Sequence, residues 1–335
     1  MILGLRWYGP VGVVVFLISA VLMLFKVDPF YSRFYDFAWY GYICFADSLV
    51  YHWRGRSLLS NRFGEFALML PLSWGVWEWF EGFNLRLDNW HYIQTIQVMG
   101  ASGVEYKTGL LPFMPKNIPH YFLSFATVLP GEFETLTLIR IWAERTNNWL
   151  HRVPMRTWEL TQQKFDLFIF FGMLCMALPM FWPKRCFPLV WLGMFLILDP
   201  INFRAGRPSI LREMSRGRAQ LFTQLLLAGM ICGGLWEFWN FWAGTKWVYT
   251  VPWPFSRMNL FEMPCLGFFG FPPFALECYA MYHYLRALPG VRLFARERSM
   301  FAIETEEGKA GAVSGAPVRR SALENTTAGC GSDWQ

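Results

Sequence analysis

The sequence predicts an all-α, polytopic membrane protein of about eight transmembrane helices, arranged as two tandem four-helix repeats of the same orientation. Three observations predict this fold class. Apolar residues make up 54% of the chain and charged residues only 16%, against roughly 25% charged residues in a typical soluble protein. The apolar residues fall in long runs between arginine-rich segments, and two runs carry nearly the same motif. A disordered chain, a collagen-like repeat and a secreted disulfide scaffold are therefore excluded.

Each transmembrane helix needs roughly 20 mainly apolar residues to cross a hydrocarbon core of about 30 Å. The apolar runs that approach this length lie at 9–26, 35–51, 64–83, 118–142, 164–183, 187–203, 220–243 and 263–285. We therefore expect a first four-helix membrane repeat at 1–145, a cytoplasmic linker at 146–163 and a second four-helix repeat at 164–290. Small polar and charged residues dominate near the C-terminus, which predicts a disordered cytoplasmic tail at 299–335.

The distribution of Lys and Arg predicts the orientation of the bundle. Most of the 30 Lys and Arg residues lie on the side of the N-terminus, including those at 54–62, 140–164 and 204–218. Cytoplasmic segments of membrane proteins carry such an excess. We therefore expect a multi-pass protein of the inner cell membrane, with both termini in the cytoplasm and with membrane lipids, rather than nucleic acid, as partners. The sequence does not indicate an oligomeric state.

Two of the apolar runs contain closely similar motifs. Residues 75–81 read GVWEWFE, and residues 234–240 read GLWEFWN. Trp is scarce, with 18 in 335 residues, so two Trp-Glu pairs in matching context indicate an internal duplication. Because each copy contains four spans, an even number, the two copies must share one orientation. The alignment matches Glu78 with Glu237 and Glu81 with Asn240.

Two further features of the sequence concern packing. Asp47 and Asp199 lie at corresponding cytoplasmic ends, where we expect them to cap the arginine-rich loops. Gly229 and Gly233 are spaced four residues apart in the seventh run. Small residues at this spacing let helices approach closely in a membrane, so we expect another backbone to pack against them.

Acidic residues inside the apolar runs are the first candidates for a functional site, because an Asp at the centre of a span costs roughly 2.5–3.5 kcal/mol. The candidate catalytic residues are polar positions of the two motifs, together with glutamates one turn after a helix-bending proline: Glu78, Glu81, Glu134, Glu237, Asn240 and Glu277. Two desolvated carboxyl groups close together favour one protonated member, which can act as a general acid. The architectural alternative is that these acids bond Trp and Tyr side chains and fix the packing.

Aromatic residues accompany these acids. The candidate substrate-binding residues belong to the two motifs and to the Trp-x-Tyr elements that follow them: Trp77, Trp79, Trp90, Tyr92, Trp236, Phe238, Trp239, Trp247 and Tyr249. Their faces can stabilise a cation or bind a flat apolar ligand. The histidines lie near the ends of the runs without an i, i+4 pair, and no phosphate-binding loop is present. We therefore expect neither a metal nor another cofactor.

The order of these elements resembles the small membrane-type lycopene cyclases and the related carotenoid hydratases. Trp236-Glu237, Lys246–Tyr249 and the proline-bearing segment Phe271–Glu277 follow one another as the acidic helix, the Trp-x-Tyr element and the proline-glutamate helix do in that family. The resemblance implies a non-redox isoprenoid or carotenoid cyclase or hydratase, in which intramembrane carboxylic acids protonate an apolar ligand. Two other functions stay open: a proton-coupled carrier or channel with titrating glutamates, and a lipid-binding or assembly protein without turnover.

Overall fold

The computed structural model is mostly helical and describes residues 4–100, 103–111, 117–252, 258–295 and 299–301. All of these residues belong to one unit. The two halves of the chain, on either side of the expected linker at 146–163, therefore pack against each other.

The helices of the first half follow the expected apolar runs. They are α1 (Tyr8–Leu24), α2 (Phe34–Arg54), α3 (Leu58–Asn61), α4 (Phe63–Leu87), α5 (Ile118–Phe125) and α6 (Val128–Thr146). The second half contains α7 (Gln162–Phe181), α8 (Pro183–Cys186), α9 (Val190–Arg204), α10 (Ile210–Ser215), α11 (Gln220–Trp242), α12 (Phe271–Leu285) and α13 (Pro289–Arg292).

The prolines before Glu134 and Glu277 lie in the first turn of a helix that follows an interruption of the expected apolar run. Pro130 lies in the first turn of α6, and Pro272 and Pro273 lie in the first turn of α12. A backbone N–H in the first turn has no partner within the helix, so a proline there sacrifices no hydrogen bond. The helical segment Ile118–Thr146 is interrupted between α5 and α6, four residues before Pro130, and the run 263–285 changes from a 3-10 helix at Cys265–Gly270 to α12 beside Pro272.

Within the described residues, four helical segments are long and apolar enough to cross a membrane: Ile118–Thr146, Gln162–Phe181, Pro183–Arg204 and Gln220–Trp242. The other expected spans also form helices but do not reach this standard. The helices α1 and α12 have 17 and 15 residues, and α2 and α4 are long enough but less apolar. Four apolar helices thus support the membrane class.

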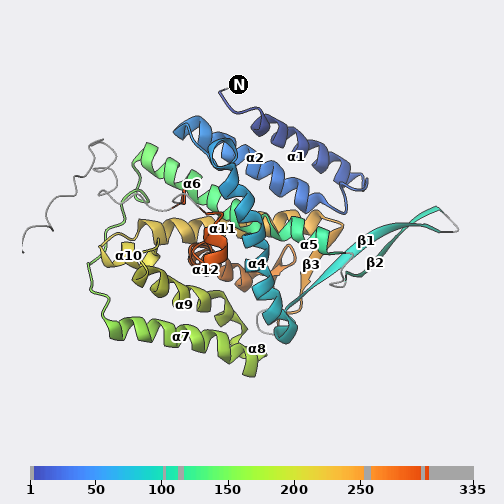
Figure 1. Cartoon of the computed structure of the whole chain (residues 1–335). Helices are drawn as coiled ribbons and strands as arrows, with labels where there is room; N and C mark the ends of the chain where they lie inside the picture. The colour runs from blue at the N-terminus through green and yellow to red at the C-terminus, as the bar shows by residue number, and fades with distance from the viewer. Residues whose placement is uncertain (1–3, 101–102, 112–116, 253–257, 296–298, 302–335) are drawn as a thin grey trace, which may run out of the picture. The chain divides into compact units, whose positions relative to one another are not determined.

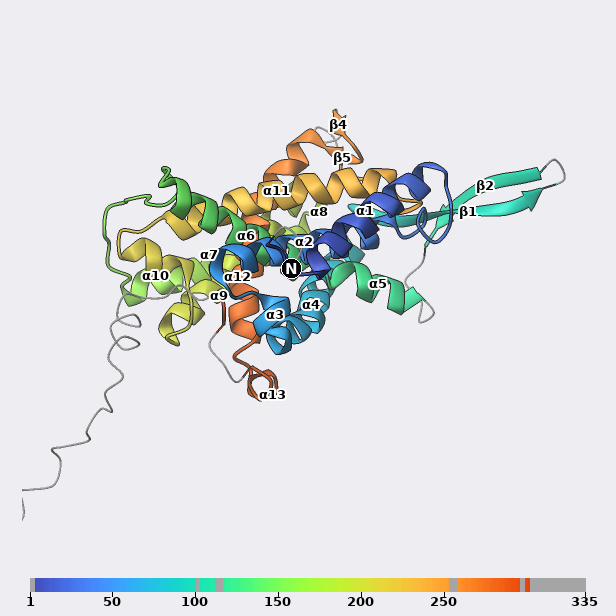
Figure 2. The ribbon, with the colours of Figure 1, turned by 90° about the horizontal axis from the view of Figure 1, so that it is seen from above.

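The expectation of an all-α fold is wrong at the Trp-x-Tyr elements, which form strands rather than loops. The strands β1 (Trp90–Gly100), β2 (Gly103–Leu110) and β3 (Thr245–Tyr249) make an antiparallel sheet in the order β2-β1-β3. A second pair, β4 (Asn259–Leu260) and β5 (Met263–Pro264), is two residues long on each side. The β1–β2 hairpin extends away from the helices in both Figure 1 and Figure 2.

The outer helices of the bundle carry exposed apolar side chains. Figure 1 shows α1 and α7 at opposite edges, with α6, α11 and α12 between them. Leu17 and Val21 on α1, and Leu167 and Phe170 on α7, are exposed. Lipid can cover such faces in a membrane, whereas in water they would form large exposed patches.

Glycines set the closest helix crossings. A Cβ added to Gly12 of α1 would lie 2.7 Å from the Gly41 carbonyl oxygen of α2, and one added to Gly172 of α7 would lie 2.9 Å from the Gly193 carbonyl oxygen of α9. A Cβ on Gly229 would collide with the Phe271 backbone at the start of α12. The expected close approach of a backbone to Gly229 is confirmed.

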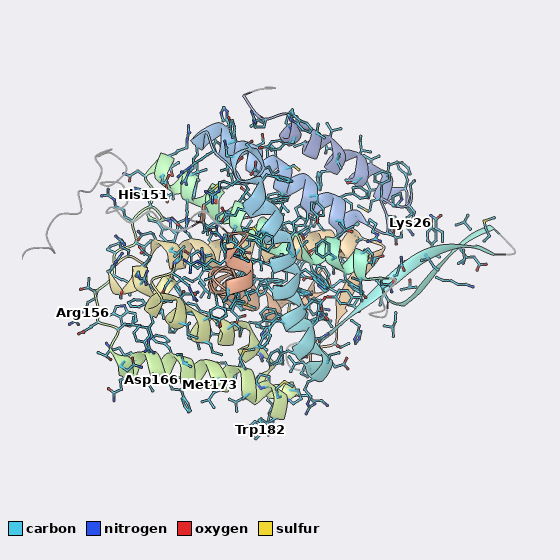
Figure 3. All side chains as sticks on the ribbon, in the orientation of Figure 1. Lys26, His151, Arg156, Asp166, Met173 and Trp182 are labelled. Carbon is cyan, nitrogen blue, oxygen red and sulfur yellow. The ribbon has the colours of Figure 1, made fainter. Side chains whose placement is uncertain are left out.

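The bundle has two chemically different ends. Arg54 donates to Glu144 at 2.9 Å, and Pro154 forms a β-bridge with Arg218, so the arginine-rich segments meet at one end. Figure 3 shows His151 and Arg156 at this end and Lys26 at the other, beside the hairpin. These are called the arginine-rich end and the hairpin end below.

The predicted tail at 299–335 starts too early. Phe301 is 1% exposed, and its ring lies 4.6 Å from the ring of Phe133 on α6. Burial of this aromatic side chain holds Ser299–Phe301 against the helices. The rest of the predicted tail, 302–335, lies outside the described residues.

Candidate ligand-binding cavity

The C-terminal end of α4 is fastened to β1 by a network around Glu81. Its Oε1 accepts hydrogen bonds from Trp77 Nε1 at 2.8 Å, Trp90 Nε1 at 3.0 Å and the Tyr92 hydroxyl at 2.5 Å. One turn later, the Asn84 amide donates to the Trp90 carbonyl oxygen at 2.8 Å and accepts from the Trp90 backbone N–H at 3.3 Å. The polar side chains of α4 therefore orient both aromatic residues of the Trp-x-Tyr element.

The C-terminal end of α11 is fastened to β3 in the same manner. Glu237 Oε1 accepts from the Tyr249 hydroxyl at 2.7 Å and from Trp247 Nε1 at 3.3 Å. The Asn240 amide donates to the Trp247 carbonyl oxygen and accepts from the Trp247 N–H, both at 2.9 Å. A Glu-x-x-Asn pair thus holds the Trp-x-Tyr element in each half.

The hydrogen-bond partners correct the register of the sequence alignment by three residues. By their partners, Glu81 corresponds to Glu237, and Asn84 corresponds to Asn240. Glu78 instead accepts from Trp74 Nε1 of its own helix at 2.8 Å. The alignment of Glu78 with Glu237 is therefore wrong, because it followed the adjacent tryptophans rather than the partners of the carboxyl groups.

The two networks meet across the sheet. Trp90 lies opposite Tyr249, and Tyr92 lies opposite Trp247, in the antiparallel register of β1 and β3. Desolvation, and next to it the neighbouring glutamates, raise the pKa of both tyrosine hydroxyls well above the ordinary value. Tyr92 and Tyr249 therefore stay protonated and act as hydrogen-bond donors to Glu81 and Glu237.

The carboxyl groups of Asp47 on α2 and Asp199 on α9 cap the short helices α3 and α10 of the arginine-rich end. Asp47 accepts from the Ser57 hydroxyl at 2.7 Å and from the Leu59 N–H at 2.9 Å. Asp199 accepts from the Ser209 hydroxyl and from the Leu211 N–H, both at 2.8 Å. Both carboxylates satisfy donors at a helix start, as expected for capping residues.

A cavity of about 110 Å³ lies between the two networks. Seven of the candidate residues line it: Trp77, Trp90, Tyr92, Trp236, Glu237, Trp247 and Tyr249. Its wall includes residues of α2, α4, α5, α6, α9, α11 and α12 and of the strands β1, β3 and β5. The sequence motifs thus identify much of one cavity wall.

Other candidate residues lie away from the cavity. Trp79 and Phe238 are 43% and 41% exposed on their helices, and the Trp239 ring packs 4.8 Å from the ring of Trp39. Glu134 and Glu277 are fully buried in α6 and α12. Glu277 accepts from the Met194 N–H at 2.8 Å, whereas neither carboxyl oxygen of Glu134 has a hydrogen-bond partner among the described residues. The structure therefore does not gather all six polar candidates into one site.

Several wall residues were missed by the sequence analysis. Trp191, at the start of α9, stacks on Phe80 with ring centroids 5.1 Å apart. Asp36 accepts from the Ser124 hydroxyl at 2.6 Å and lies 3.8 Å from His120. These residues come from runs distant in the chain. The sequence signal for Asp36 was an acidic residue at the start of an apolar run. No comparable signal in the sequence pointed to His120.

Four polar atoms of the wall are buried without a hydrogen-bond partner in the described part of the chain: Asp36 Oδ2, Trp236 Nε1, Glu237 Oε2 and Thr245 Oγ1. Asp36 Oδ2 lies 3.5 Å from Arg33 Nη1, which makes an ion pair with it. Glu237 is 0% exposed, and no ion pair with it is found among the described residues. A carboxyl group in this setting can present one oxygen to a ligand while the other is held by Tyr249 and Trp247.

No family model, curated protein or solved structure matches this chain. In the described residues, no group of three or more His, Cys, Asp or Glu side chains is arranged to hold a metal. The four apolar helices fit a membrane protein.

Proposed function

We propose that this chain is a multi-pass membrane enzyme that protonates a carbon–carbon double bond of an isoprenoid-type ligand, as a non-redox cyclase or hydratase does, and that Glu237 is its proton donor. The observation that carries the proposal is the fully buried Glu237 carboxyl, which lines an aromatic cavity and has an unpartnered Oε2.

The surroundings of Glu237 suit this chemistry. A carboxyl group donates a proton only in its neutral form, which an apolar wall favours. Protonation of a double bond leaves a carbocation, and aromatic faces stabilise a nearby cation. Trp236, Trp247 and Trp90 line the same cavity as the acid.

The cavity volume limits how much ligand enters. A cavity of about 110 Å³ is smaller than the engineered 150 Å³ cavity that binds benzene, so it holds one end group rather than a whole polyene. The remainder of an isoprenoid chain would lie outside, where the surrounding bilayer can solvate it.

The carrier alternative is less well supported. A carrier needs a route to both faces of the membrane. The residues of the arginine-rich segments at 54–62 and 204–218 are not among those that line the cavity. This one-sided cavity favours ligand binding over passage.

The architecture proposed with this function is eight spans in two tandem repeats of the same orientation. It adds α1, α2, α4 and α12 to the four apolar spans and places the arginine-rich end, with both termini, on the cytoplasmic side of the inner membrane. Support comes from the matching Glu-x-x-Asn networks and from the crossing of α1 with α2 and of α7 with α9 on paired glycines.

The proposal is tested with purified full-length protein in detergent. Organic extracts of the protein are analysed for bound isoprenoids by mass spectrometry, and the protein is incubated in D₂O with a hydrocarbon, squalene, and with an isoprenoid alcohol, geranylgeraniol. We expect a retained isoprenoid and a product that carries deuterium on carbon. A bound isoprenoid without deuterium in any product would indicate a binding protein without turnover, and the absence of both would contradict the proposal.

A further inference from the structure

The cavity wall contains more hydrogen-bonding capacity than its own residues use. Trp236, Glu237 and Thr245 line the cavity and are 5%, 0% and 7% exposed, and each has one buried polar atom without a hydrogen-bond partner among the described residues. Buried polar groups are almost always paired, because leaving them unpaired costs free energy. Three such atoms around one cavity point to a polar group in the ligand.

The three atoms define what that group must offer. Trp236 Nε1–H is a donor only and needs an acceptor, whereas the Thr245 hydroxyl can donate or accept. Glu237 Oε2 donates when it carries the proton and accepts when it does not. A ligand oxygen can accept from Trp236, and a hydroxyl or carbonyl oxygen can equally accept from Thr245 or from a protonated Glu237. A hydrocarbon can pair with none of them.

Trp77 provides an internal contrast. It lines the same cavity, but its Nε1–H already donates to Glu81 at 2.8 Å and to the Tyr92 hydroxyl at 3.2 Å. Of Trp77 and Trp236, only Trp236 on α11, next to the proposed acid, has a buried N–H without a partner among the described residues.

We propose that the end of the ligand that enters the cavity carries a hydroxyl or carbonyl oxygen, so that the ligand is an oxygenated isoprenoid rather than a pure hydrocarbon. This inference rests on the proposed function, because it names the ligand class of the same cavity. The oxygen accepts a hydrogen bond from Trp236 and lies within reach of Thr245 and Glu237.

The test compares two probes that differ in one oxygen: geranylgeraniol and the tetraene hydrocarbon of the same carbon skeleton without the hydroxyl. Binding of each to the full-length protein in detergent is measured by equilibrium partition of radiolabelled probe. One or two buried hydrogen bonds make the alcohol bind about tenfold more tightly. Trp236→Phe and Thr245→Val should each bring the ratio of the two affinities towards one.

Trp191→Phe is the matched control, since Trp191 lines the cavity but its N–H is not among the buried unpartnered atoms. It should weaken both probes alike and leave their ratio unchanged. Equal affinities in the wild type, unaffected by Trp236→Phe, would overturn the inference and indicate that water pairs these atoms. Failure of both probes to bind would contradict the cavity function as well. A preference for the alcohol without deuterium incorporation from D₂O would retain the inference and reject the enzyme.

Discussion

Glu81 and Glu237 accept hydrogen bonds from the same two residue types, a tryptophan and a tyrosine that are separated by one residue on an adjoining strand. Their surroundings nevertheless differ. Glu237 lines the cavity and keeps Oε2 unpartnered, whereas Glu81 is not part of the cavity wall and takes a third bond, from Trp77. Two similar hydrogen-bond networks thus hold carboxyl groups of which only one, that of Glu237, lines the cavity.

Asn84 and Asn240 should contribute similarly to stability, because each fastens a helix end to a strand through its side-chain amide. Replacement of either by Ala leaves buried backbone groups unpaired, which costs about 1–3 kcal/mol for each lost partner. Thermal unfolding in detergent should show comparable losses for Asn84→Ala and Asn240→Ala. Asn259, whose side chain is exposed, serves as the control, since Asn259→Ala should unfold like the parent. A large loss for one asparagine and none for the other would contradict the equivalence of the two networks.

Gly12 and Gly172 should not tolerate a methyl group. An added Cβ at either position meets the backbone carbonyl of the crossing helix at under 3.0 Å, so α1 or α7 must move. We expect Gly12→Ala and Gly172→Ala to lower the free energy of unfolding by about 1–3 kcal/mol. On α4, a Cβ at Gly75 meets nothing within 4 Å, and Gly75→Ala should be neutral or slightly stabilising. Equal behaviour of all three variants in thermal unfolding would show that the crossings are not this close.

The two ends of the bundle should lie on opposite sides of the membrane. Arg156 at the arginine-rich end and Glu105 on the hairpin are both exposed, and Cys265 is a native exposed thiol. In a background in which Cys265 and Cys330 are both replaced by Ser, a membrane-impermeant maleimide added to intact cells should label Glu105→Cys but not Arg156→Cys. After lysis both should react. Labelling of Arg156→Cys in intact cells would reverse the proposed orientation, and labelling of both would place the two ends on one side.

The helices were predictable from the sequence, because long apolar runs give a strong local signal. The strands were not. Trp90 pairs with Tyr249 although more than 150 residues separate them in the chain. Strand formation at each element therefore depends on a partner that the local sequence does not reveal. The same limit affected the alignment of the two Trp-Glu motifs. The adjacent tryptophans made Glu78 look like Glu237, whereas the contacts of the carboxyl groups match Glu81 with Glu237.

The cavity was predictable in part. The Trp-x-Tyr elements and Trp236-Glu237 stand out because tryptophan and buried acids are rare in a membrane helix. Trp79 and Phe238 stand beside them in sequence, but successive helical residues point in different directions, and these two face outwards. Asp36 and His120 join the wall from separate runs, which a sequence motif cannot show.

Product formation by Glu237→Gln, compared with that by Glu78→Gln, shows whether the Glu237 carboxyl is the proton donor. Glutamine keeps the shape of the side chain and an acceptor oxygen for Tyr249 and Trp247, but it cannot donate a proton to carbon. Deuterium incorporation from D₂O into the isoprenoid product is measured in both variants, and thermal unfolding confirms that both fold. The account predicts a 10²–10⁴-fold loss for Glu237→Gln, as for removal of a general acid, and a rate near that of the parent for Glu78→Gln. A folded Glu237→Gln protein with an undiminished rate would contradict it.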